Sequence, residues 1–239
     1  GFYPGYDLSG SIEVYDTSSD TIPIKTFRNE DNLSPYSYFI IKFDKDGNFI
    51  WINHINGYLQ GNDSDITFYP DYYKFIEIGL NTDTSNNLYL TSAFNPPCGL
   101  LPTLNIYKPG TNEIDKTIIT SQSINAATGI FNIKFDEDGN YIWHTTILSS
   151  ADIAQARGLL QSTNCVDSSG NLYISFMNSV IYSYTVYDKF ETEVYNFNNN
   201  KELYLFTSLV KFDRDGNFIW SNYILYDETY NGFTGFPVI

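Results

Sequence analysis

Basic residues are scarce in this chain of 239 residues, which carries 13 Lys and Arg against 28 Asp and Glu. The formal charge of −15 would repel a polyanion over most of the surface, so we expect no nucleic-acid partner. Long apolar runs are also missing, because no stretch approaches the roughly 18 residues of a membrane helix. Residues 1–10 lack the regions of a signal peptide, although processing could have removed one. We expect no membrane insertion and leave the compartment open.

Residue types that serve catalysis and metal binding are equally few. No Cys/His cluster has the spacing of a metal site, and neither a Gly-rich phosphate loop nor a nucleophile elbow occurs. The two histidines, His54 and His144, fall in different copies of a repeat, which favours structural roles. Cys98 and Cys165 do not occupy corresponding places, and we expect them to be unpaired instead of bonded to each other.

Carboxylate recognition of the sialidase kind would need several arginines gathered in one place. The chain has only three arginines, which are Arg28, Arg157 and Arg214. Arg214 stands at the tip of an expected hairpin. The sequence therefore predicts no catalytic residue and no cofactor-binding residue, and we do not expect an enzyme.

A repeat dominates what is present. One nine-residue segment occurs three times and contains every Trp of the chain: Phe43–Trp51 (FDKDGNFIW), Phe135–Trp143 (FDEDGNYIW) and Phe212–Trp220 (FDRDGNFIW). Two other segments recur between these copies: Thr82–Ser92 matches Val166–Phe176, and Ile12–Tyr15 matches Leu104–Tyr107 and Tyr184–Tyr187. We expect one repeat domain over residues 1–239, with units at approximately 1–80, 81–165 and 166–239.

Each recurring segment has the pattern of a β-strand. Apolar and aromatic residues alternate over five to eight positions and are interrupted by Asp, Asn, Gly and Ser. The exception is 151–157 (ADIAQAR), where one or two helical turns are possible from the pattern. The sequence therefore predicts an all-β fold.

The turn inside the Trp segment can be predicted in detail. In Asp44–Asn48, a type I turn followed by a left-handed glycine would close a hairpin with a bulge. Positive φ is then expected at Gly47, Gly139 and Gly216.

The strands on either side of the turn are apolar on both faces. Phe49, Trp51 and Ile55 are expected on one face, and Ile40, Ile50 and Ile52 on the other. Sheets with two apolar faces must be covered on both sides, so we expect small antiparallel sheets stacked on one another.

The pairing of the K-F-D-x-D-G-N-x-x-W hairpin with a D-x-x-G-N-L-Y-L-T-S hairpin resembles the SBBP-type bacterial β-propeller repeats. It is more distantly similar to the repeats of quinoprotein-type propellers. The resemblance implies a β-propeller-like repeat of small antiparallel sheets. Three units are fewer than the four to eight blades of a closed propeller, so we expect either a fragment of a larger ring or closure through another subunit.

This chain departs from the resembled pattern in two ways. Its units are longer by a segment around Tyr15, Tyr107 and Tyr187, and Asn86 stands where the pattern has Gly.

Two features invite a functional interpretation, and for both we favour a structural one. The paired acidic residues of the turns, Asp44/Asp46, Asp136/Asp138 and Asp213/Asp215, resemble the start of a calcium loop, but the distal Glu ligand is missing. Calcium at these turns stays an alternative. The Trp residues, Trp51, Trp143 and Trp220, could form a ligand platform, but we expect anchors that pack one sheet on the next.

Binding residues are expected in the variable connections. The segments Tyr69–Tyr73 and Tyr195–Asn200 are rich in Tyr and Asn, a composition that suits glycan or protein surfaces. We therefore predict a non-enzymatic structural or recognition module that binds proteins or glycans through loops and is capable of self-assembly. The alternative is an enzyme or cofactor-binding propeller of quinoprotein type. The abundance of Asn, Ile, Tyr and Phe resembles the composition encoded by an AT-rich genome. Repeat proteins of this kind occur in bacteria and in large DNA viruses, so we expect an extracellular, cell-surface or virion component. Composition does not choose between these locations.

Overall fold

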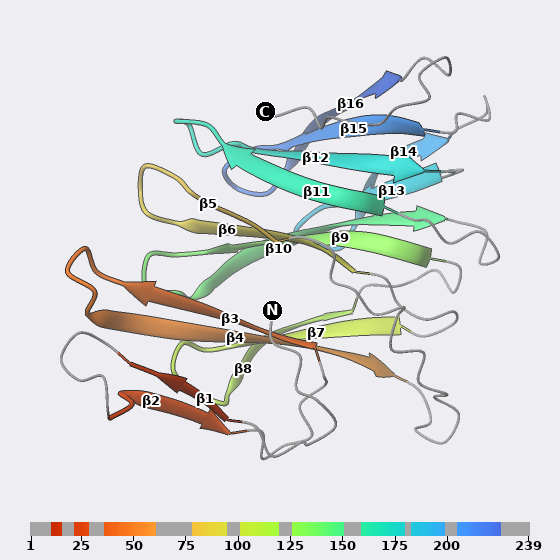
Figure 1. Cartoon of the computed structure of the whole chain (residues 1–239). Helices are drawn as coiled ribbons and strands as arrows, with labels where there is room; N and C mark the ends of the chain where they lie inside the picture. Colours follow the sequence, from red (N-terminus) through yellow and green to blue (C-terminus); the bar gives the residue numbers. More distant parts are fainter. Residues whose placement is uncertain are drawn as a thin grey trace. The chain divides into compact units, whose positions relative to one another are not determined.

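The structure, a computed structural model, describes residues 11–15, 22–28, 36–60, 78–94, 101–119, 126–150, 159–179, 183–198 and 205–225. Within these ranges 16 strands form four antiparallel sheets, and no helix is present (Figure 1). The expected all-β fold is confirmed. The segment 151–157 lies outside the described residues. None of the described segments has the length and hydropathy of a membrane-spanning helix.

The strands are β1 (Ser11–Val14), β2 (Lys25–Arg28), β3 (Tyr36–Phe43), β4 (Phe49–Gln60), β5 (Ile78–Thr82), β6 (Leu88–Phe94), β7 (Leu101–Tyr107), β8 (Ile114–Ile119), β9 (Ala126–Phe135), β10 (Tyr141–Ser150), β11 (Leu159–Val166), β12 (Leu172–Ser179), β13 (Ser183–Tyr187), β14 (Glu193–Asn198), β15 (Leu205–Phe212) and β16 (Phe218–Leu225).

Three kinds of hairpin recur, one for each repeated segment. The Trp hairpins are β3–β4, β9–β10 and β15–β16. The Asn-Leu-Tyr hairpins are β5–β6 and β11–β12. The Tyr hairpins are β1–β2, β7–β8 and β13–β14.

The hairpins are interleaved among the sheets. The six-stranded sheet has the order β14-β13-β10-β9-β6-β5 and contains one hairpin of each kind. The other sheets have the orders β3-β4-β7-β8, β11-β12-β15-β16 and β1-β2. Along the chain, the pieces of one sheet are separated by a hairpin of another, so a sheet is not one continuous stretch of sequence.

The chain divides into two compact units. The first comprises residues 1–60, 102–119 and 138–141, and the second comprises 61–101, 120–137 and 142–239.

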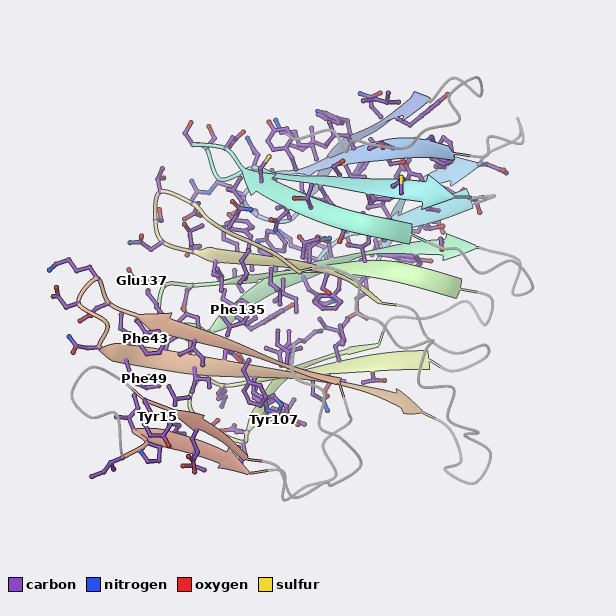
Figure 2. The ribbon with its side chains drawn as sticks, in the orientation of Figure 1. Tyr15, Phe43, Phe49, Tyr107, Phe135 and Glu137 are labelled. Atoms are coloured by element: carbon purple, nitrogen blue, oxygen red, sulfur yellow. The ribbon has the colours of Figure 1, made fainter. Side chains whose placement is uncertain are left out.

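In the first unit, the β1–β2 hairpin packs against one face of β4. Val14 and Ile52 form a buried core there, lined by Phe39, Ile41 and Phe49. Figure 2 shows Phe49 on β4, on the side of the strand that faces β1 and β2.

The expectation that Phe49 shares a face with Trp51 and Ile55 is wrong. The register shifts between Lys42 and Phe43, so that Lys42 pairs with Trp51 and Phe43 with Phe49. This bulge interrupts the alternation, because one extra residue of β4 is passed over at the end of the hairpin. Phe49 consequently packs with Ile52 and Val14, on the face of β4 opposite to Trp51.

In the second unit, the six-stranded sheet and the sheet β11-β12-β15-β16 pack face to face (Figure 1). Their shared core is strongly aromatic and joins side chains of both sheets: Tyr89, Trp143, Phe176, Tyr184, Phe197, Phe206 and Phe212, together with Ile130, Ile147, Leu172, Ile174, Val186 and Val210. Burial on this scale is the main contribution to the stability of the unit.

The predicted turn geometry is confirmed. Gly47, Gly139 and Gly216 have φ values of 84°, 85° and 82°. Asn86, which replaces Gly, adopts the same left-handed conformation with φ 60°. Asn tolerates this region better than most residues, which explains the replacement.

Candidate functional site: the stacking clusters

Two of the repeat Trp side chains, Trp51 and Trp143, lie directly beneath the glycine turn of the following repeat. A Cβ atom built on Gly139 would stand 2.9 Å from Cδ2 of Trp51, within the first unit. In the second unit, a Cβ on Gly216 would stand 2.9 Å from Cδ2 of Trp143. Such contacts are too short for any side chain, so these positions need glycine both for φ and for space. Trp51 and Trp143 are therefore buried packing anchors.

A cluster of four side chains surrounds the second of these contacts. Tyr89, Lys134 and Trp143, together with Asp83, form what we call the covered cluster. The Lys134 ammonium lies 4.8 Å from the Tyr89 ring centroid and 5.9 Å from that of Trp143. It is also 3.7 Å from the Asp83 carboxylate, and both of these charged side chains are buried.

Side chains of the covered cluster donate hydrogen bonds to backbone carbonyls of two hairpin turns. Lys134 Nζ donates to the carbonyl of Arg214 at 2.9 Å, and Trp143 Nε1 donates to the same oxygen at 3.2 Å. The Tyr89 hydroxyl donates to the carbonyl of Gly170 at 3.1 Å. Two hairpin turns of one sheet are thus fixed on the side chains of the other.

Burial shifts the ionisation of the cluster. The pKa of Lys134 is lowered because burial disfavours its charged form, an effect that Asp83 partly opposes. The pKa of Tyr89 is raised by burial and by the neighbouring Asp83 carboxylate.

The same arrangement recurs on the outward side of the sheet β11-β12-β15-β16, and we call it the open cluster. Lys211 lies 4.8 Å from the Tyr173 ring centroid, and the rings of Tyr173 and Trp220 are 6.2 Å apart. In the covered cluster the corresponding Tyr89–Trp143 distance is 5.9 Å. The Tyr173 hydroxyl also donates to Asp167 at 3.1 Å. The Tyr89 hydroxyl lies at the same distance from Asp83, so its one proton is shared between Asp83 and the Gly170 carbonyl. Trp220, however, is only half-buried.

The first aspartates of two acidic turns, Asp44 and Asp213, are engaged by the turn itself. Asp213 Oδ1 accepts from the backbone N–H groups of Asp215 and Asn217, and its Oδ2 accepts from the Asn217 amide at 2.8 Å. Asp44 and Asp167 have the same three bonds. Hydrogen bonding by the Asn48 amide lowers the pKa of Asp44, as the Asn171 amide lowers that of Asp167.

The second aspartates point to solvent. Asp46 forms an exposed ion pair with Lys45 at 2.9 Å, and Asp215 lies 3.9 Å from Arg214 Nε. Across the described ranges, no three His, Cys, Asp or Glu side chains gather as a metal site would require. In the described geometry, Asp44 and Asp213 act as turn residues.

The two histidines lie in different packing environments. His54 is stacked between Phe39 and Tyr107, with ring centroids 4.7 and 4.6 Å away. Burial lowers its pKa to about 4, so the ring is neutral at physiological pH. His144 is buried in the second unit, with Nε2 3.5 Å from Oε1 of Glu191. The two rings are thus parts of packed cores.

The cysteines, the arginines and the Tyr-rich segment are the remaining candidates, and the structure describes only some of them. Cys165 is a free thiol whose pKa is raised by burial. Cys98, Arg157 and the segment Tyr69–Tyr73 lie outside the described residues. Arg28 ends strand β2, and Arg214 takes part in the covered cluster through its carbonyl.

The expected loop Tyr195–Asn200 is in large part strand. Residues 195–198 belong to β14, where Tyr195 stacks on Phe218 at 5.3 Å and Phe197 stacks on Tyr184 at 5.0 Å. The alternation of aromatic residues with Asn at 196 and 198 is the pattern of a half-buried strand, and it could have indicated this. These two rings are core, so they are not available to a ligand.

Sequence reasoning also missed Lys134 and Tyr89. The signal was present, since Lys recurs two residues before each repeated Asp, at Lys42, Lys134 and Lys211. Periodicity alone does not show that such a lysine lies under a tyrosine ring of a different hairpin.

No protein-family model matches the chain, and no curated protein matches its sequence.

Proposed function

We propose that this chain is a non-enzymatic structural or recognition module built as a propeller-like scaffold. What supports the scaffold is that sheets of the second unit pack face to face through the repeat residues. The interleaving of hairpins would distinguish this scaffold from a propeller in which each blade is one continuous stretch of sequence.

One observation supports the non-enzymatic part: among the described residues, the buried lysine, a stacked histidine and the first turn aspartates serve packing and turn structure. Lys134 is bonded to a turn carbonyl, His54 is stacked between two rings, and the turn aspartates accept backbone N–H groups. Catalytic groups need a substrate within hydrogen-bond reach, whereas the hydrogen bonds and ring contacts of these side chains already serve the fold.

Recognition is assigned to connections such as Tyr69–Tyr73, whose aromatic and hydroxyl groups suit glycan or protein surfaces. This role, and a place on a cell surface or virion, are consistent with the acidic and Asn-rich composition.

Thermal unfolding with added ligands tests the proposal. The melting temperature is measured with calcium chloride, with a panel of glycans and with pyrroloquinoline quinone. We expect no shift with calcium, because the oxygens of Asp44 and Asp213 already accept hydrogen bonds. We expect none with the quinone, because basic residues that would bind its carboxylates are scarce in the sequence. A large shift with the quinone alone would overturn the proposal in favour of a cofactor-binding propeller. Magnesium chloride at equal ionic strength is the control for calcium.

A further inference from the structure

The outward face of the sheet β11-β12-β15-β16 exposes side chains whose counterparts in the other sheets are buried. Ile224 follows the repeat Trp by four residues and is 56% exposed. At the same place, Ile55 in the first unit and Ile147 in the six-stranded sheet are 0% exposed. These three isoleucines occupy the same position of the repeat. The difference in their exposed fractions therefore depends on whether another element covers the face of the sheet.

The edge of the same sheet is also incomplete among the described strands. Strand β4 pairs with β7, and β10 pairs with β13, so each of these Trp strands is flanked by a Tyr hairpin. Strand β16 is the last described strand of its sheet (Figure 1). An edge strand exposes backbone N–H and C=O groups that can pair with another strand.

In the first unit, a Tyr hairpin lacks a neighbouring Trp strand among the described strands. The Tyr hairpin β1–β2 forms a two-stranded sheet of its own, with no Trp strand beside β1 in the described part of the chain. The turn glycine Gly47 is half-exposed, whereas Gly139 and Gly216 are buried over their indoles. The first unit therefore presents a Tyr hairpin and a glycine turn, and the second presents a Trp strand and the open cluster.

We propose that the chain associates head to tail, with the β1–β2 hairpin and the Asp44–Asn48 turn of a second copy docking on β16 and the open cluster. The inference deepens the proposed scaffold function by naming another copy of the chain as the partner, and it rests on that function.

A single docking geometry makes both contacts. In the second unit, β10 is flanked by β13 while its Trp143 lies under the Gly216 turn, so one Trp strand receives both elements. The two elements also touch each other there, since the Tyr184 and Ser221 hydroxyls are 2.8 Å apart. In the first unit, β1 and β4 are also in contact, through Val14 and Ile52, and Ile52 is the repeat equivalent of Ser221. The first unit thus carries the hairpin and the turn already arranged for a Trp strand.

The existing register predicts the residue pairs of the new contact. Thr146 pairs with Tyr187 and Ile147 with Val186, which places Tyr223 opposite Tyr15 and Ile224 opposite Val14. Above them, Gly47 would lie on Trp220. Lys211 and Trp220 would donate to the carbonyl of Lys45, as Lys134 and Trp143 donate to that of Arg214.

The contact joins two different surfaces, so it repeats from copy to copy. Such heterologous association gives a ring if the rotation closes and a filament if it does not.

Light scattering coupled to size exclusion, over a concentration series, tests the association. We expect the mass to rise above the 27.4 kDa of one chain as concentration increases. Ile224→Lys should return the mass to that of one chain, because it places a charge at the buried centre of the contact. Ile219→Lys is the matched control, because Ile219 and its equivalents Ile50 and Ile142 are exposed in every repeat. A wild-type chain of single mass at all concentrations, or an Ile224→Lys variant that assembles normally, would overturn the proposal.

Disulfide trapping tests the orientation. Tyr15→Cys and Tyr223→Cys are made in separate chains that also carry Cys98→Ser and Cys165→Ser, and are then mixed under mild oxidation. Directly opposed residues of antiparallel strands have Cα atoms about 4.5–5.5 Å apart, within the reach of a disulfide. We expect a cross-linked dimer from the mixture and not from either variant alone. Cross-linking within a single variant would indicate a symmetric contact and overturn the proposal, as would its absence from the mixture.

Different measurements test the non-enzymatic assignment and the head-to-tail contact, so either proposal can be overturned without the other. A quinone-dependent shift in melting temperature would remove the non-enzymatic assignment and leave the mass measurements unaffected. A strictly single chain would remove the head-to-tail contact and leave the ligand measurements unaffected.

Discussion

At the scale of single residues, aromatic rings pack against charged and polar side chains inside the fold. The Lys134 ammonium lies over the rings of Tyr89 and Trp143, and the His54 ring is stacked between Phe39 and Tyr107. Planar rings offer large contact areas with few rotatable bonds, so they order at small entropic cost. The consequence is that charged and polar residues become part of the core, where their protonation is tied to folding.

The stacking of His54 makes stability dependent on pH in a defined window. Its folded pKa is about 4 and its ordinary value is 6.5, so between these values the unfolded chain binds the extra proton. The free energy of unfolding must therefore fall as the pH falls from about 6.5 towards 4, by about 2–3 kcal/mol at pH 4.5.

His54→Phe tests this window, because phenylalanine keeps the ring in the stack and cannot be protonated. Urea unfolding between pH 7.5 and 4.5 should show a shallower loss of stability for His54→Phe than for the wild type. Parallel curves for the two proteins would contradict the assignment. Measurements stay above pH 4.5 because the turn aspartates, whose pKa values are lowered, begin to lose their contribution at lower pH.

The sequence predicted the conformation of a residue where neighbouring residues determine it. It did not predict features that depend on another strand or hairpin. Positive φ at Gly47 follows from the turn chemistry of its immediate neighbours. The face occupied by Phe49 does not, because a bulge shifts the alternation by one residue even though the bulge itself was predicted. The burial of Lys134 depends on Tyr89, which is supplied by a different hairpin.

At the scale of elements, the hairpin turn is the unit that connects one layer to the next. The turn glycine lies on an indole, and the adjacent carbonyl accepts hydrogen bonds from the side chains beneath it. The contact therefore requires a bare Cα and fails if a side chain is added.

Gly139→Ala and Gly110→Ala separate the two reasons for glycine. Both residues lie in the first unit with positive φ, but a Cβ on Gly110 meets nothing within 4 Å, whereas one on Gly139 meets the Trp51 ring. Gly110→Ala should cost about 1–2 kcal/mol of unfolding free energy, from backbone strain alone. Gly139→Ala should cost a further 1–3 kcal/mol, roughly, from overpacking. Chemical denaturation measures both.

A double-mutant cycle completes this test. In a Trp51→Ala background, the extra cost of Gly139→Ala over Gly110→Ala should disappear, because the indole is gone. An extra cost that persists without the indole would show that Trp51 is not what excludes the side chain.

Pairing among hairpins was beyond sequence analysis for a physical reason. Period-two alternation and turn residues specify each hairpin, since all of that information lies within about 15 residues. Whether β10 is flanked by β13 or by a nearer hairpin is decided by long-range packing of residues such as Tyr184 and Val186. The all-β class could be predicted, and the interleaved order of the sheets could not.

At the scale of the whole molecule, high negative charge and repeated apolar faces act in opposite directions. Each copy carries a formal charge of −15, so approaching copies repel one another. The exposed Ile224 and half-buried Trp220 favour association, because covering them removes apolar area from water. The balance between these effects must respond to salt.

Head-to-tail association should therefore strengthen as sodium chloride is raised from about 0.05 to 0.5 M, since the screening length falls from beyond 10 Å to a few ångströms. Sedimentation equilibrium measures the dissociation constant, which should decrease several-fold across this range. Ile224→Lys is the control and should remain a single chain at every salt concentration. Weaker association at high salt would contradict the expectation, because it would mean that attraction between opposite charges, such as Lys211 and the acidic turn, exceeds the repulsion between whole copies. The sign of the salt effect thus distinguishes a contact held by buried apolar surface from one held by ion pairs.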